Sequence, residues 1–348
     1  MNSEAALGLA HLGLHPDRNR QLVERLGSPA AVLGAISAGS EAVSDAIRQR
    51  LASTPTEIET SLARLGAKAL IRGTAGYPDH LNELPDSPPV LFVKGELPAV
   101  LAVALVGSRR ATSYGRRLAR RFGQAVAEVG WPVVSGLARG IDIAAHQGCL
   151  EAGGVGIGVL GSGLDRFYPA EHRPIGERLV AGGGAIVTEY PLGTTPEGWR
   201  FPPRNRIIAG LSAAVVVVEA AVTGGALITA NAALSYGRAV LAVPGDIERE
   251  TSRGCNLLIR DGAYPVLGVD ELIEALGFVL GPPRVRPKAD IPEEDPLLSA
   301  LGSELRSPDW LAEHLNESPS RILAMIGRLQ ALGRIEFDGI VVAAIPGR

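Results

Sequence analysis

The chain has 348 residues, with 34 Lys and Arg against 37 Asp and Glu, a formal charge of -3. At roughly 150 residues per domain, this length predicts two or three domains. The overall charge argues against a protein coated with cations for nucleic acid. Of the 34 cations, however, 31 are arginine, which binds phosphate bidentately and stacks on bases. The codon bias of a GC-rich genome is the other explanation of this excess.

Cysteine content and hydropathy predict a cytoplasmic protein. The two cysteines, Cys149 and Cys255, cannot form a disulfide framework, which favours a reducing compartment. The N-terminal residues contain no basic n-region, and the longest apolar run, 207–218, is far shorter than the roughly 20 residues that span a bilayer. The histidines and cysteines are scattered without ligand spacing, so no metal site is expected.

The sequence pattern divides the chain into four segments. Residues 1–66 read as short helices joined by Gly, Ser and Pro turns, which predicts a small helical domain. Residues 67–280 alternate strand-like runs with segments of helical length. Residues 281–296 are rich in proline and charge, as in a linker. Residues 297–348 show the order helix, helix, hairpin, which predicts a winged helix.

Most strand candidates of the second segment are apolar throughout, as expected for strands covered on both faces of a parallel sheet. The segment therefore predicts an α/β domain with a Rossmann-like, doubly wound parallel sheet. Its ligand is expected at the carboxyl ends of the strands. The candidates are 101–106, 131–135, 155–161, 184–188, 213–219 and 239–243.

The loop after the first of these strands has the composition of a phosphate site. It reads Gly107-Ser108-Arg109-Arg110 and precedes a helix, whose N-terminus offers unpaired N–H groups. An ordinary tight turn is the alternative. The segment 101–140 carries seven arginines and one acid, so an anion site is expected there unless the fold brings acids beside it. The run lacks both a GxGxxG motif and a Walker lysine, which excludes a nicotinamide site and P-loop chemistry.

Two further strand ends add candidates. The second strand ends near Ser135, Gly136 and Arg139, which places them on the ligand edge of the sheet. Asp142 and His146 follow one helical turn apart, either as a catalytic pair or as residues that cap and pack a helix. The third strand ends in GSGLDRFYP, whose aromatic side chains plug the edge of the sheet in the simplest interpretation.

The segment after the fourth strand, 190–212, reads as a long loop that mixes aromatic and arginine side chains. Bases stack on aromatic rings and arginines bind the intervening phosphates, so the composition suits single-stranded nucleic acid. The alternative is a loop held by Phe201 in the core. The fifth strand is followed by Thr223-Gly224-Gly225, which predicts a second backbone nest for phosphate at a helix start.

Six motifs occur in a fixed order along the chain. They are GSRRATSYG, SGLARGIDIAAHQG, GSGLDRFYP, FPPRNRIIAGLS, VVVVEAAVTGGALITANAALSYGR and AVPGDI. Together they resemble the DNA-processing protein A family, DprA or Smf. The resemblance covers about residues 76–277, and the two ends of the chain resemble the family's sterile-alpha-motif-like and winged-helix domains more weakly.

The resemblance implies a function. Members of the family bind single-stranded DNA, protect incoming strands during natural transformation and load the RecA recombinase. They form homodimers through the Rossmann-like domain. They are not known as enzymes, and the resemblance implies neither a cofactor nor a membrane contact.

The resemblance and the strand-end loops together assign a set of DNA-binding residues. Ser108 and Arg109 should contact phosphate, with Gly107 permitting its approach, and Phe201 should stack on a base. The family pattern has a lysine three residues before the phenylalanine, where this chain has Gly198, and Arg200 is expected to replace its charge. The full set is Gly107, Ser108, Arg109, Arg110, Ser135, Gly136, Arg139, Arg200, Phe201, Arg204, Asn205, Arg206, Thr223, Gly224 and Gly225.

The alternative function is an enzyme, a nucleotide 5'-monophosphate phosphoribohydrolase of the lysine-decarboxylase-like family. Those proteins use the same type of sheet and a PGGxGTxxE motif whose final glutamate is catalytic. Here Gly224-Gly225 is followed by ALITANAA with no acid before Asp246, so the general acid/base is missing. The release of free base from nucleoside monophosphates would reveal such an enzyme.

Overall fold

The computed structural model describes residues 2–282, 295–301, 305–331 and 334–344. The chain forms two compact units, Met1–Val285 and Arg286–Arg348, each of which is described by itself. Most of the predicted linker, 281–296, lies outside the described residues. The predicted boundary after residue 66 stays a prediction.

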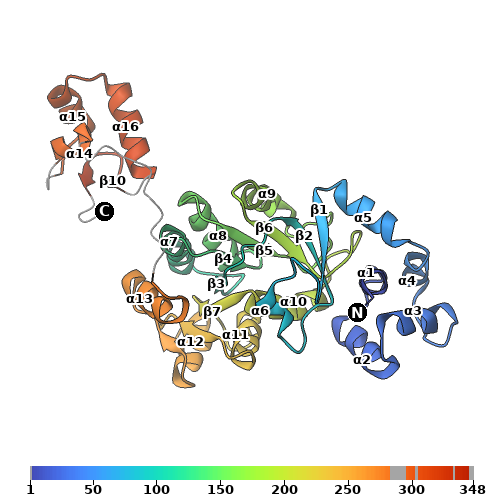
Figure 1. Ribbon diagram of the computed structural model, residues 1–348. Coiled ribbons are helices and arrows are strands. Elements are labelled where there is room, and N and C mark those ends of the chain that lie inside the picture. The colour runs from blue at the N-terminus through green and yellow to red at the C-terminus, as the bar shows by residue number, and fades with distance from the viewer. Residues whose placement is uncertain (1, 283–294, 302–304, 332–333, 345–348) are drawn as a thin grey trace. The chain divides into compact units, whose positions relative to one another are not determined.

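A nine-stranded sheet forms the centre of the larger unit (Figure 1). Its order is β1-β2-β6-β5-β4-β3-β7-β8-β9, parallel from β6 to β9, with β2 antiparallel to β6 and β1 antiparallel to β2. The predicted doubly wound, mostly parallel sheet is thus confirmed. The strands are β1 (Ala67–Ile71), β2 (Val90–Gly95), β3 (Ala102–Val106), β4 (Val133–Ser135), β5 (Gly156–Val159), β6 (Ala185–Thr188), β7 (Ser212–Val217), β8 (Ala239–Ala242) and β9 (Tyr264–Pro265).

The strand order reverses between β3 and β7. The chain winds from β3 through β6 towards one edge and from β7 through β9 towards the other. In open α/β sheets, ligands bind beyond the carboxyl ends of the strands at such a switch point. Every residue of β3 and β7 is buried, which explains why both strands read as continuous apolar runs.

Helices cover both faces of this sheet (Figure 1). On one face α10 and α11 pack against β3 and β7, and on the other α7, α8 and α13 do. The helices of the larger unit are α1 (Ser3–His11), α2 (Pro16–Leu26), α3 (Pro29–Ser37), α4 (Asp45–Arg50), α5 (Pro55–Ala63), α6 (Asp79–Asn82), α7 (Ser113–Glu128), α8 (Ile141–Glu151), α9 (Arg173–Ala181), α10 (Phe201–Gly210), α11 (Gly225–Ser235), α12 (Glu250–Arg260) and α13 (Val269–Leu280), with 3-10 turns η1 (Ala170–His172) and η2 (Gly198–Arg200).

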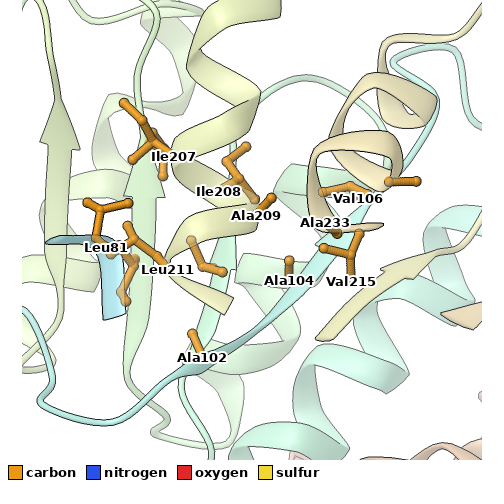
Figure 2. Packing of buried hydrophobic residues seen from close by; sticks show 14 of the residues in the cluster. Leu81, Ala102, Ala104, Val106, Ile207, Ile208, Ala209, Leu211, Val215 and Ala233 are labelled. Carbon is orange, nitrogen blue, oxygen red and sulfur yellow. The ribbon is translucent and has the colours of Figure 1, made fainter. Parts of the chain in front are cut away.

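The core beside α10 positions the site. Side chains of β3 alternate between the two faces, with Val103 and Leu105 in the core beside α7 and α8. On the opposite face α10 packs its apolar residues over β3 and β7 (Figure 2). The labelled residues of this cluster are Leu81, Ala102, Ala104, Val106, Ile207, Ile208, Ala209, Leu211, Val215 and Ala233.

The N-terminal helices are joined to the sheet through an apolar core. Leu7 of α1 and Leu62 of α5 pack with Val90 and Phe92 of β2. A second cluster, which includes Leu12 of the loop after α1, joins α1 to α2 and α3. The helical segment therefore packs on the edge of the sheet.

The smaller unit contains three helices and a hairpin. They are α14 (Pro296–Leu301), α15 (Pro308–Leu315), α16 (Pro319–Ala331), β10 (Ile335–Phe337) and β11 (Val342–Ala344). Ser307 caps α15, and the side chain of Asp338 accepts two backbone N–H bonds in the hairpin turn. The winged-helix assignment of residues 297–348 stays a prediction.

One predicted element is wrong. The segment 190–212 was expected to be a loop, but it contains the helix α10, which begins at Phe201. Pro202 and Pro203 lie in the first turn of α10, where proline is tolerated because its missing N–H would have no intrahelical partner.

The described part of the chain shows neither a membrane-spanning helix nor a metal-binding cluster. None of the described helices is long and apolar enough to cross a membrane. In the same part of the chain, His, Cys, Asp and Glu residues form no group of three or more that could hold a metal ion.

Candidate nucleic-acid interface

A pocket of about 400 Å³ lies at the switch point between β3 and β7. Its walls are the loop after β3, the segment after β7, the start of α10 and the start of α11. A recess of about 200 Å³ adjoins it and shares Arg109, Phe201 and Arg204. The predicted residues that line the pocket are Gly107, Ser108, Arg109, Arg110, Phe201, Arg204, Asn205, Gly224 and Gly225.

Arg109 and Phe201 meet across the mouth of this pocket. The Arg109 guanidinium lies over the Phe201 ring, 4.7 Å from its centroid, and Tyr168 is tilted against the same ring at 5.7 Å. Arg109 and Arg110 are exposed, and neither forms an ion pair with a described carboxylate. An exposed, unpaired guanidinium beside an aromatic face is suited to a phosphate and its base.

The phenylalanine ring rests on a glycine. A Cβ at Gly161, just beyond β5, would lie 2.9 Å from the Phe201 ring, so no side chain fits there. The ring is half-buried, which leaves part of it facing the pocket. The glycine-rich end of the third predicted strand thus packs against the aromatic ring.

Arg204 has a buried, structural position at the base of the pocket. It is 3% exposed, and its Nη1 donates to the carbonyl of Gly136, at 2.8 Å, and to that of Val159. Burial lowers the pKa of Arg204 to about 10. Its Nε donates to the Asn205 side chain, which in turn donates to the Gly225 carbonyl at 3.1 Å. These bonds tie α10 to β4, β5 and α11.

Asp142 and His146 form no hydrogen bond with each other. The Asp142 carboxylate accepts from the Gly136 N–H at 3.2 Å; burial raises its pKa, and the nearby Arg204 guanidinium opposes this shift. The His146 ring is fully buried, which lowers its pKa to about 4. The buried positions of Asp142 and His146 agree with residues that cap and pack a helix.

The loop after β3 is held by an internal carboxylate. Glu219, after β7, accepts from the Thr112 N–H at 2.8 Å and from its hydroxyl at 2.5 Å, at the start of α7. A Cβ at Gly107 would lie 2.5 Å from Ile141 and 2.8 Å from the Glu219 carbonyl oxygen. Packing therefore accounts for Gly107, whereas we expected a glycine that admits a phosphate.

The structure does not bring six predicted residues into this pocket. The buried Ser135 hydroxyl donates to the Leu105 carbonyl at 2.6 Å. Arg206 is bound by both oxygens of Glu189 at 2.8 Å and lines another cavity, and Arg200 lies over the Trp199 ring away from the pocket. Thr223 is exposed outside the pocket lining. Arg139 pairs with Glu171 at the adjoining recess, which Gly136 also lines.

The excess positive charge of residues 101–140 is partly offset by acids from elsewhere. Arg120 pairs with Glu151 at 2.5 Å, and Arg139 pairs with Glu171 at 2.5 Å. Arg109 and Arg110 keep their charge available at the pocket mouth. Of the seven arginines of this segment, the fold thus places two, both exposed, at the mouth of the predicted anion site.

Comparison with known proteins tests the resemblance. The family model for DNA recombination-mediator protein A matches residues 68–277. Protein Smf of Escherichia coli is 39% identical over 285 residues, which cover 78% of this chain and 74% of that protein. This chain belongs to the DprA family.

Solved structures of the family agree. DNA processing protein A from Streptococcus pneumoniae gives a TM-score of 0.61 at 33% identity, covering 77% of this chain and 95% of that one. DNA processing protein A from Helicobacter pylori, whose structure is described for its single-stranded DNA binding mode, gives a TM-score of 0.53 at 26% identity. The match covers 60% of this chain and 95% of that one.

Sequence reasoning missed Tyr168 as a site residue of this DprA-family chain. It was read as a plug for the sheet edge, but it is 40% exposed and lines the recess against Phe201. Its neighbour Phe167 is buried and does pack in the core. The signal was available, because Tyr168 follows a glycine-rich strand end on the ligand edge of the sheet.

The buried position of Arg204 predicts a stability effect that Arg109 lacks. Arg204→Met should lower the free energy of unfolding by about 3 to 5 kcal/mol, because it leaves two buried carbonyls and Asp142 without their cation. Arg109→Met, at an exposed position, should change it by about 0.5 kcal/mol or less. Urea denaturation of both variants measures this, and equal losses would contradict the structural role.

Proposed function

We propose that this chain binds single-stranded DNA at the switch-point pocket and thereby serves in DNA processing during transformation. The observation that carries the proposal is the exposed Arg109 guanidinium stacked 4.7 Å from the Phe201 ring, with no described carboxylate paired to it. The family membership supports it, as does the single-stranded DNA binding named for the Helicobacter pylori relative.

The pocket suits a single strand better than a duplex. Arg109 and Arg110 take backbone phosphates at the mouth, while an unpaired base stacks on Phe201 beside Tyr168. A paired base inside a duplex does not expose its faces to such a ring. The buried Arg204 and Asn205 take no direct part in this proposal, because their polar groups already bind the protein backbone and each other.

Protection of incoming strands and the loading of RecA remain predictions of the family resemblance. The segment 297–348 carries five cations and six acids, so it does not present an excess of positive charge for a duplex. We propose that this segment contacts either protein or DNA, and that strand protection follows from occupancy of the switch-point pocket.

We further propose a homodimer through the Rossmann-like domain. Five exposed large apolar side chains occur in the last part of this domain, from the segment after β8 to α13, and Phe278 on α13 is 85% exposed. Exposed apolar patches mark protein contacts, and we propose that these side chains form one. Its members are Ile247, Tyr264, Leu267, Phe278 and Val279.

Arg109→Ala should weaken binding of a dT20 oligonucleotide and reduce its salt dependence. One lost phosphate contact lowers the slope of log K against log salt by about 0.7 for a single strand. Arg117→Ala is the matched control, because Arg117 is exposed on α7 outside the pocket lining. Fluorescence anisotropy across a salt series measures both, and identical slopes would remove Arg109 from the site.

Phe201→Ala should reduce affinity for the same oligonucleotide by about 1 to 3 kcal/mol without changing the salt slope, since stacking is lost and no charge is removed. Phe201→Tyr keeps an aromatic face and should bind nearly as the wild type does. The same anisotropy titrations report both variants. Equal affinity of the alanine and tyrosine variants would exclude stacking at this position.

Phe278→Glu should convert the proposed dimer to a monomer, because a carboxylate buried in an apolar contact loses its hydration. Leu234→Glu on α11 is the control, as Leu234 is exposed but lies outside the patch. Size-exclusion chromatography with light scattering gives the mass of each. A dimer that survives Phe278→Glu, or a monomeric wild type, would refute this interface.

A further inference from the structure

A second cavity lies on the other side of the short segment that carries Phe201. It has a volume of about 440 Å³ and is bounded by the N-terminal helices and the segment 193–200. We call it the Arg50 pocket. Its polar and aromatic lining includes His15, Arg18, Arg50, Thr194, Trp199 and Arg200.

The Arg50 and Arg200 guanidiniums both line this pocket, and only Arg200 has a carboxylate partner among the described residues. Arg50 forms only long contacts, to the carbonyls of His11 at 3.4 Å and Leu192 at 3.5 Å, and pairs with no described carboxylate. Burial and the nearby Arg200 charge lower the pKa of Arg50. The neighbouring Asp165 only partly opposes this, and its carboxylate accepts the Gly193 N–H at 2.8 Å.

Arg200 is fixed in place by aromatic and acidic neighbours. Its guanidinium lies 4.3 Å from the Trp199 ring centroid, and His15 stacks on the same indole at 5.1 Å. The Glu197 carboxylate accepts a hydrogen bond from Nη1 of Arg200 at 2.6 Å. The side chain is 12% exposed, so its charge is held at the wall of the pocket.

An unpartnered hydroxyl points to a ligand in the same cavity. Thr194 lines the pocket and is only 3% exposed, yet its hydroxyl oxygen has no hydrogen-bond partner among the described residues. The Nε of Arg200 is likewise buried without one. Buried polar groups without partners are rare in native proteins and costly. Both are donors, which a phosphate oxygen satisfies.

We propose that the Arg50 pocket binds a phosphate group through Arg50, Arg200 and the Thr194 hydroxyl. The group belongs either to the backbone of a strand that passes Phe201 or to a small phosphate-bearing molecule. The first source rests on the proposed function, and the second does not. Arg200 and Phe201 are consecutive, with Cα atoms about 3.8 Å apart, so one strand can reach both pockets.

The test uses two probes and the full-length chain. Inorganic phosphate is titrated while tryptophan fluorescence is followed, with Trp199→Phe identifying the part of the signal that comes from Trp199 among the three tryptophans, and dT20 binding is measured by anisotropy across salt. The variants are Arg50→Gln, Arg50→Lys and Thr194→Val, with Arg48→Gln as the matched control, since Arg48 is exposed on α4 and does not line the pocket. Circular dichroism verifies that each variant is folded.

Arg50→Gln should weaken phosphate binding about tenfold, the effect of one charged hydrogen bond. Arg50→Lys should lose less because it keeps the charge, and Thr194→Val should be intermediate. If the strand is the source, Arg50→Gln also lowers the dT20 salt slope by about 0.7. If the source is a small molecule, dT20 binding stays unchanged while phosphate binding is lost.

The proposal is overturned if Arg50→Gln and Arg48→Gln give the same values with both probes. Its failure is distinguishable from failure of the proposed function. If the wild-type chain binds phosphate near Trp199 but binds no oligonucleotide, the proposed DNA site is refuted and the phosphate site in the Arg50 pocket stands. If Arg109→Ala weakens dT20 binding while Arg50→Gln changes neither dT20 nor phosphate binding, the phosphate site is refuted and the DNA site stands.

Discussion

The geometry of the switch-point pocket depends on the buried guanidinium of Arg204. Its bonds to the carbonyls of Gly136 and Val159 fix the first turn of α10 against the carboxyl ends of β4 and β5. Phe201 stands one helical turn earlier, on the same face of the helix. Once Arg204 is bound, the Phe201 ring lies over Gly161 and meets Arg109 from the loop after β3. The aromatic face and the exposed cation are brought together by a buried cation that touches neither phosphate nor base in our proposal.

The arginines of this chain serve two different purposes, which reconciles a net charge of -3 with an anion site. Arg204 and Arg206 are buried or nearly so and bind carbonyls or carboxylates of the protein. Arg109 and Arg110 remain exposed at the pocket mouth. A guanidinium suits the buried role because its several fixed donors can satisfy diverging acceptors. Total charge therefore says little about the partner, whereas the position of the unpaired cations does.

The sequence predicted the sheet well and the orientation of side chains poorly. The six predicted strands of the main domain all occur within two residues of their expected ends, because continuous apolar runs report burial on both faces. Arg204 and Arg206 were assigned to one pocket because 190–212 was read as a loop. On a helix, residues two apart point about 200° away from each other, which sends them to different cavities. The inward direction of Ser135 depends on the Leu105 carbonyl of the neighbouring strand, a contact that no local pattern encodes.

The glycine-rich loop after β3 shows that a motif can mark an edge of the sheet for a reason other than the one its residues suggest. Its glycine was read as the feature that admits a phosphate, but the space beside Gly107 is filled by Ile141 and the Glu219 carbonyl. Glu219 also occupies N–H and hydroxyl donors at the start of α7, where an anion was expected. What this loop offers a ligand is therefore the exposed Arg109 side chain, while the glycine and the internal carboxylate set the backbone that presents it. Since this presentation depends on β7 lying next to β3, the proposed anion site is a property of the switch point and not of the loop sequence alone.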